Sequence, residues 1–197
     1  MSTPVVTDFK DTAFAVSTGF GTAVAITGIT NAAEAVVTKV AHGLVDNDVV
    51  KMAAVGGMVE VNDRLFVVDI LTVDTFKLIG ADTANYGVYT SGGTFAKATF
   101  SNSCQVTGYQ GPSGTTPSNT TDTNCGSAKS YGTPQAGQVS VTWASASTAF
   151  VNAFRDARKV AEQVALKITL PKNRGVSIDL GTVVSFDPGA ASANGTW

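Results

Sequence analysis

The 197-residue chain has few charged residues and no long apolar segment. Lys and Arg number 13 and Asp and Glu number 15, so charged residues make up 14% of the chain and the formal net charge is −2. Proteins that bind nucleic acids tightly normally carry an excess of basic residues. The balance of charges here therefore argues against tight nucleic-acid binding. No apolar run approaches the roughly 18 residues of a membrane-spanning helix, and the first residues lack the basic and apolar regions of a secretory signal. We therefore expect no membrane partner and no export by a signal peptide.

Cysteine and histidine are also scarce, which leaves little material for a catalytic or metal site. Cys104 and Cys125 have no third cysteine and no neighbouring histidine to complete a metal site, and two free thiols are favoured over one disulfide. His42, the single histidine, lies in a turn-like sequence with no Ser or Cys beside it to activate. The sequence therefore predicts no enzymatic activity, no metal and no cofactor.

Small and β-branched residues are abundant instead. Val and Thr occur 26 times each and Gly 20 times, which favours strands joined by Gly-rich turns. Hydrophobic residues make up 44% of the chain, enough for a packed core, and the length suits one large domain or two small ones. We expect a mainly β protein.

Residues 24–96 have the texture of a separate module. Turn residues separate short strand-like runs at 35–40, 49–52, 59–62, 65–70, 75–79 and 93–96. Such spacing is typical of a small antiparallel barrel or sandwich. We therefore predict an inserted β domain at 24–96 and a discontinuous domain made of residues 1–23 and 97–197.

The flanking segments carry further strands and one helix. Strand-like runs lie at 5–18, 100–109, 138–143, 166–170, 176–180 and 183–186, the first ended by a turn at Gly19-Phe20-Gly21 and the last followed by a tail of small residues. A helix is predicted from Ser147 to about Gln163, because apolar residues recur three and four apart along one stripe. That stripe, which we expect to pack against a sheet, consists of Phe150, Phe154, Ala157, Ala161 and Val164.

Several motifs within the inserted module resemble a known small barrel. They include Ile26-Thr27-Gly28-Ile29-Thr30, Ala41-His42-Gly43-Leu44, the run from Val55 to Asn62, Asp74-Thr75-Phe76-Lys77-Leu78 and Ser91-Gly92-Gly93. Together they resemble the FCCH-like β-barrel, named after ubiquitin-activating enzymes. The resemblance implies a surface-decorating domain and does not by itself imply one function.

The flanking segments resemble the major tail tube protein of long-tailed, siphovirus-type bacteriophages. The residues that carry this resemblance are Val6 to Lys10, Thr120 to Lys129, Gly137 to Trp143, the predicted helix, and Leu166 to Pro171. The resemblance implies a tail-tube-type β-sandwich or barrel with one flanking helix. It also implies six-subunit rings that stack into a tube through which DNA reaches the host.

The same resemblance implies partners and a location. The partners would be other copies of the chain, the tape measure protein and tail terminator or baseplate proteins, with double-stranded DNA passing through transiently. The location would be the virion tail, after assembly in the host cytoplasm.

Two sets of residues are expected to serve such a tube. Between Ala98 and Phe150 the only charged residues are Lys129 and Asp122, and a surface that neutralises few phosphates lets a duplex slide. Residues 138–143 alternate between apolar and polar, and their uncharged polar members, Gln138, Ser140 and Thr142, are the candidate lumen-facing residues. The tract 111–137 is too long and polar for a simple connection, and its first part is the candidate ring-stacking loop: Gly111, Pro112, Ser113, Gly114, Thr115, Thr116, Pro117, Ser118, Asn119, Thr120, Thr121 and Asp122.

Two other functions stay open at this point. One is a capsid decoration or baseplate protein that carries the same module. The other is a carbohydrate-binding or adhesin module, in which Tyr86 and Tyr89 would form a stacking platform. Rings with a central channel would favour the tube, and isolated monomers or trimers the decoration protein.

Overall fold

The structure is a computed structural model that describes residues 12–103, 106–110, 118–123, 126–131, 138–143, 148–170, 175–187 and 192–196. Within them the protein is mainly β, as predicted. The strands are β1 (Ala13–Phe20), β2 (Val24–Ala25), β3 (Gly28–Ile29), β4 (Val36–Thr38), β5 (Val49–Gly56), β6 (Leu65–Thr72), β7 (Thr75–Leu78), β8 (Ser91–Ser103), β9 (Val106–Gln110), β10 (Ser118–Thr123), β11 (Gly126–Tyr131), β12 (Gln138–Trp143), β13 (Gln163–Thr169), β14 (Val176–Asp187) and β15 (Ser192–Thr196). The described helices are α1 (Thr148–Val160) and the short 3-10 helix η1 (Val59–Val61).

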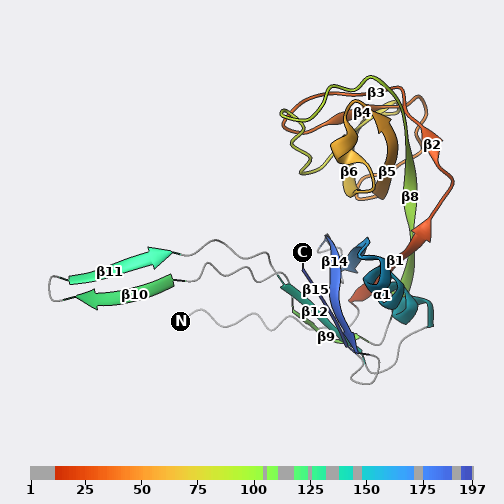
Figure 1. Cartoon of the computed structure of the whole chain (residues 1–197). Helices are drawn as coiled ribbons and strands as arrows, with labels where there is room; N and C mark the ends of the chain where they lie inside the picture. The colour runs from red at the N-terminus through yellow and green to blue at the C-terminus, as the bar shows by residue number, and fades with distance from the viewer. Residues whose placement is uncertain are drawn as a thin grey trace.

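Thirteen strands form one antiparallel sheet that runs through two lobes (Figure 1). The strand order is β3-β4-β7-β6-β5-β8-β1-β13-β14-β15-β12-β9, and β2 pairs with β8 beside this path. The upper lobe in Figure 1 holds β2 to β7 and the first part of β8, and the lower lobe holds the other strands of the sheet with α1. The 13-residue strand β8 therefore belongs to both lobes.

The upper lobe has its own core. Its fully buried side chains include Met52, Phe76 and Phe95, and the two Phe rings meet edge to face at 5.4 Å. The strand predicted at 59–62 is wrong, because η1 occupies this position. Gly57, at φ +83°, turns the chain directly after β5, and Asn62 then hydrogen-bonds both backbone groups of Val55 at 2.8 and 3.1 Å, so the segment folds back on β5.

The sheet of the lower lobe curls around a second core. Strands β8 and β9 lie far apart in the strand order, yet only two residues separate them in the chain, so Ser103 and Val106 lie within about 11 Å of each other. Tyr109 of β9 accordingly packs against Phe14 of β1, with ring centroids 5.7 Å apart. Helix α1 packs on the same core, whose buried side chains include Val16, Val141 and Leu166.

Helix α1 ends earlier than predicted. Ala161 adopts a left-handed conformation, φ +53°, and the chain enters β13 at Gln163. The helix residues Phe150, Phe154 and Ala157 are buried in the core of the lower lobe. Val164 is also buried but belongs to β13, and the placement of Ala161 on the stripe is wrong because this exposed residue lies beyond the last helical turn. Of the described helices, none has the length and apolar character needed to cross a membrane.

Four further expectations differ from the structure. The two strands predicted at 176–180 and 183–186 are one continuous strand, β14. The tail predicted after residue 186 contains β15, which pairs with β12 on one side and β14 on the other. The turn predicted at residues 19–21 begins later, because Gly19 and Phe20 still belong to β1; the irregularity there is a register shift between Ser17 and Gly19. The polar tract 111–137 contains two paired strands, β10 and β11.

Candidate assembly surfaces

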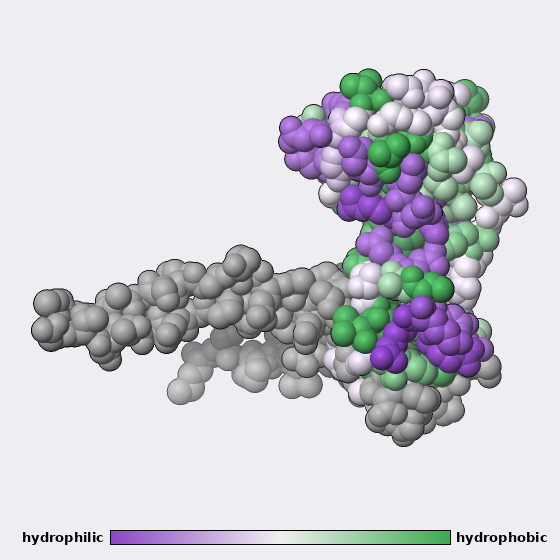
Figure 2. Space-filling view, in the orientation of Figure 1, coloured by the Kyte–Doolittle hydropathy of each residue, from purple (hydrophilic) through white to green (hydrophobic). Residues whose placement is uncertain are grey.

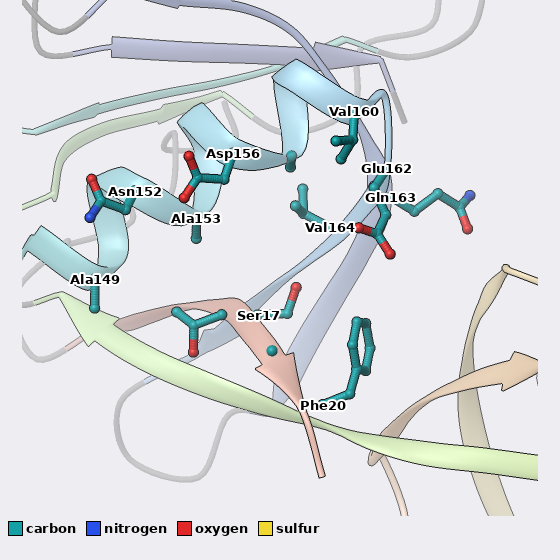
Figure 3. Close-up of a pocket in the computed structure, with 13 residues that line it drawn as sticks. Ser17, Phe20, Ala149, Asn152, Ala153, Asp156, Val160, Glu162, Gln163 and Val164 are labelled. Carbon is teal, nitrogen blue, oxygen red and sulfur yellow. The ribbon is translucent and has the colours of Figure 1, made fainter. Parts of the chain in front are cut away.

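A groove of about 490 Å³ lies between the end of β1 and α1 (Figure 3). Phe20, Ala153 and Val160 supply apolar lining, and Asn152, Asp156 and Glu162 supply polar groups. The hydroxyl of Ser17, which also lines the groove, accepts a hydrogen bond from the Ala165 N–H at 2.9 Å. Among the described residues, neither a histidine nor a cysteine lines the groove.

Both carboxylates of the groove have cationic partners within the chain. Arg155 bonds Asp156 at 3.1 Å and Lys159 approaches it at 3.5 Å, and the Arg155 hydrogen bond holds the pKa of Asp156 below its usual value. Glu162 pairs with Lys51 of the upper lobe. Among the described residues that line the groove, both charged side chains are thus paired within the chain.

His42 has a structural role in the upper lobe. Its Nδ1 accepts a hydrogen bond from the Leu44 N–H at 3.0 Å, so its Nε2 carries the proton and donates to the Thr72 carbonyl at 2.9 Å. The ring also packs edge to face on Phe76. Across the described ranges, no group of three or more His, Cys, Asp or Glu side chains is placed to hold a metal ion. Cys104 and Cys125 lie outside those ranges.

Tyr86 and Tyr89, the candidate stacking platform, are half-buried against the upper core. Arg64 donates a hydrogen bond to the Tyr86 hydroxyl at 3.0 Å, and the Tyr89 hydroxyl donates to the Gly92 carbonyl at 2.9 Å. Both side chains thus pack on the upper core and hydrogen-bond within the upper lobe through their hydroxyls.

Strand β9 is an edge of the sheet. Its residues pair with β12, and within the described residues no strand pairs with its other side. The sequence of β9, Val-Thr-Gly-Tyr-Gln, contains neither a charge nor a proline. In monomeric proteins, charged residues or prolines in an edge strand commonly prevent it from pairing with another chain.

Tyr109 ties this edge strand to the lobe. Its hydroxyl donates a hydrogen bond to Asp179 Oδ2 of β14 at 2.6 Å. Burial, reinforced by this hydrogen bond, raises the pKa of Tyr109 well above its ordinary value of 10.0. The contact leaves no signal in the sequence, because the two residues lie 70 positions apart and neither stands in a motif.

The hairpin of β10 and β11 projects from the lower lobe in Figure 1. Its register runs from Ser118 opposite Tyr131 to Thr123 opposite Gly126, and within the described residues these two strands form a sheet of their own. The candidate ring-stacking residues 118–122 therefore belong to β10, whereas residues 111–117 lie outside the described ranges.

Strand β12 carries two of the three candidate lumen residues on one face. Val141 and Trp143 are buried in the lower core, and the alternating residues Ser140 and Thr142 are half-buried on the other face. Thr107 of β9 donates a hydrogen bond to the Thr142 hydroxyl at 3.4 Å. The backbone of Gln138 lies at the start of β12, opposite Thr196 of β15.

Comparison with known proteins corrects one expectation. The family model of the ubiquitin-activating enzyme E1 FCCH domain matches residues 32–98, about the range of the upper lobe. No curated protein matches the chain. The resemblance of the flanking segments to tail tube proteins is therefore wrong as a family assignment, since the matching model is that of the FCCH domain alone.

Proposed function

We propose that the chain is a structural subunit that assembles with copies of itself through the lower lobe. The observation that carries this proposal is the contrast between the edges of the two lobes. In the upper lobe the outermost strands β2 and β3 are two residues long, and such short edges resist pairing with other chains. The edge β9 of the lower lobe is five residues long and carries neither a charge nor a proline, and its one irregularity is a register shift against β12 at Thr107.

The hairpin supports the same proposal. An isolated two-stranded hairpin is at best marginally stable in water. Strands β10 and β11 pair only with each other among the described residues, so a contact with a neighbouring copy would supply the missing stabilisation. An edge strand and a projecting hairpin on one lobe give each copy two different contact regions, which suits rings that also stack.

The finer features of this function are part of the proposal. We propose that the lower lobe is a barrel-like or sandwich-like assembly domain with one flanking helix, and that the upper lobe is an inserted small β-barrel at the outside. Rings of copies would stack into a tube, with Ser140 and Thr142 on the uncharged surface along which double-stranded DNA slides. Three features stay predictions. They are six subunits per ring, contacts with a tape measure protein and with terminator or baseplate proteins, and a place in the virion tail.

The edge strand provides the test. Thr107→Lys places a charge on an exposed position of β9, and Thr169→Lys places the same charge on an exposed position of the interior strand β13. We expect the native chain and Thr169→Lys to form large oligomers in sedimentation velocity, and Thr107→Lys to stay a folded monomer. A native chain that stays monomeric, or a Thr107→Lys chain that assembles like the control, would contradict the proposal.

A further inference from the structure

The two lobes meet in a small apolar cluster beside β8. Val49 and Leu65 of the upper lobe are buried there against Ala98 of β8 and Ala165 of β13. Half-buried Val67, Phe100, Ile178 and Leu180 surround them. Two of the four central side chains are alanines, so most of the apolar contact in this cluster comes from Val49, Leu65 and the half-buried side chains around them.

Polar contacts around Lys51 join the same two lobes. The Lys51 ammonium pairs with Glu162, which follows α1, and approaches Asp63 at 3.8 Å. It also lies over the ring of Phe20, 5.4 Å from the centroid. Beside it, the Leu65 N–H donates a hydrogen bond to Gln163 Oε1 at 3.0 Å. Lys51, Leu65, Glu162 and Gln163 are called the Lys51 clamp below.

The lower-lobe residues of the clamp are held in place by the end of α1. Glu162 and Gln163 directly follow Ala161, whose left-handed conformation turns the chain from the helix into β13. The Glu162 N–H donates to the Ala157 carbonyl at 3.1 Å, which fixes this turn to the helix. A crevice of about 400 Å³ opens beside the clamp, and the Lys51 and Glu162 side chains are 23% and 40% exposed, so solvent reaches their contact. Figure 2 shows hydrophilic surface where the lobes meet.

The chain crosses between the lobes at one narrow place. It enters the upper lobe past Gly21 and leaves it through Lys97, and the Gly21 N–H donates to the Lys97 carbonyl at 2.8 Å. Two adjacent extended segments resist stretching but bend more easily than a packed sheet. Without further contacts, the upper lobe would swing about this crossing.

We infer that the Lys51 clamp fixes the angle of the upper lobe, and that opening the clamp frees the lobe to swing about residues 96–98 of β8. The clamp makes one rigid body of two lobes with separate cores. This inference does not depend on self-assembly. In an assembly, it would place every upper lobe at the same angle.

Distance measurement between spin labels tests the inference. One label replaces Asn85 of the upper lobe and the other replaces Thr169 of the lower lobe, both exposed, in a chain with Cys104→Ser and Cys125→Ser. Labelled chains are diluted with unlabelled ones so that only distances within a chain are recorded. The clamp variant is Glu162→Gln with Gln163→Ala. The matched control is Glu34→Gln, which removes a similarly exposed ion pair with Lys77 inside the upper lobe.

We expect one narrow distance distribution for the native chain and for Glu34→Gln, and a broad one for the clamp variant. A broad distribution in the native chain, or a narrow one in the folded clamp variant, would overturn the inference. If the clamp variant does not fold, Lys51→Met takes its place, because methionine keeps much of the apolar stem near Phe20. The same two outcomes then decide.

Discussion

At the scale of single residues, the lower lobe depends on the aromatic rings around Trp143. Phe154 stacks on Trp143 with centroids 6.0 Å apart, Phe186 stacks on it at 6.3 Å, and Phe150 meets it edge to face at 6.1 Å. These residues come from β12, α1 and β14. One cluster of rings therefore holds the helix on the sheet.

Phe154→Asp is expected to unfold the lower lobe. The Phe154 side chain is 2% exposed. Removing its ring costs about 3 to 5 kcal/mol, and burying an unpaired carboxylate adds to this cost. Val160→Asp is the control, because Val160 lies on the same helix and is 66% exposed. Circular dichroism and urea unfolding would distinguish the two variants, and a Phe154→Asp protein as stable as the control would show that this interpretation of the core is wrong.

Tyr109→Phe is expected to change how stability depends on pH. The raised pKa of Tyr109 means that the folded state favours the protonated phenol. This stabilisation is fully present below the unfolded pKa of about 10 and is lost as the pH rises towards the folded value. At neutral pH the variant loses the hydrogen bond to Asp179, at a cost of about 1 kcal/mol in this half-exposed site.

Urea unfolding at neutral and alkaline pH measures this effect. The free energy of unfolding should fall more steeply above a pH of about 10 in the native chain than in Tyr109→Phe, so the difference between them shrinks. Tyr89→Phe is the control, since the Tyr89 hydroxyl donates to an uncharged carbonyl. Parallel pH curves for the native chain and Tyr109→Phe would contradict the assigned contact.

At the scale of elements, the sequence predicted strands whose signals are local. The β-branched runs that begin at Val49 and Leu65 form β5 and β6. Strand β15 was missed, because Ser, Ala, Asn and Gly have low strand propensity and pairing on both sides holds this segment. The run at 59–62 was misassigned for the opposite reason, because its apolar residues suit a strand but Gly57 turns the chain.

The contacts between distant residues left no signal in the sequence. Lys51 and Glu162 lie 111 positions apart, and only the curled sheet and the end of α1 bring them together. The polar alternation in β12, in contrast, was visible because Val141 and Trp143 must face the core. Local periodicity therefore predicted the faces of strands, and tertiary packing decided which faces and edges meet.

Removing the β10–β11 hairpin is expected to block stacking without unfolding the subunit. A short Gly-containing turn would replace residues 118–131. No other described strand pairs with the hairpin, so the lower core should keep its stability. Replacing Asp122 and Lys129 with Ser, with the hairpin intact, serves as a control for the charges alone. Electron microscopy should show rings that do not elongate, and normal tubes from the shortened chain would remove the hairpin from the stacking contact.

At the scale of the whole molecule, the chain enters and leaves the upper lobe at one place, so the lobe can be deleted there. The hydrogen bond between Gly21 and Lys97 means that a short Gly/Ser linker would span the gap left by deleting residues 24–96. The deletion uncovers Ala98 and Ala165, which Val49 and Leu65 cover. We expect the shortened chain to assemble, and the additional changes Ile178→Thr and Leu180→Thr to improve its solubility. If both shortened chains stay monomeric while the full chain assembles, the upper lobe takes part in assembly.

Electron microscopy of the purified 197-residue chain tests the central claim most directly. The proposal of a self-assembling subunit predicts rings with a central channel, and stacks of such rings at higher protein concentration. Averaged images viewed along the channel would give the number of subunits in a ring, and we expect six. Isolated two-lobed particles, or compact trimers without a channel, at every protein concentration would contradict the account.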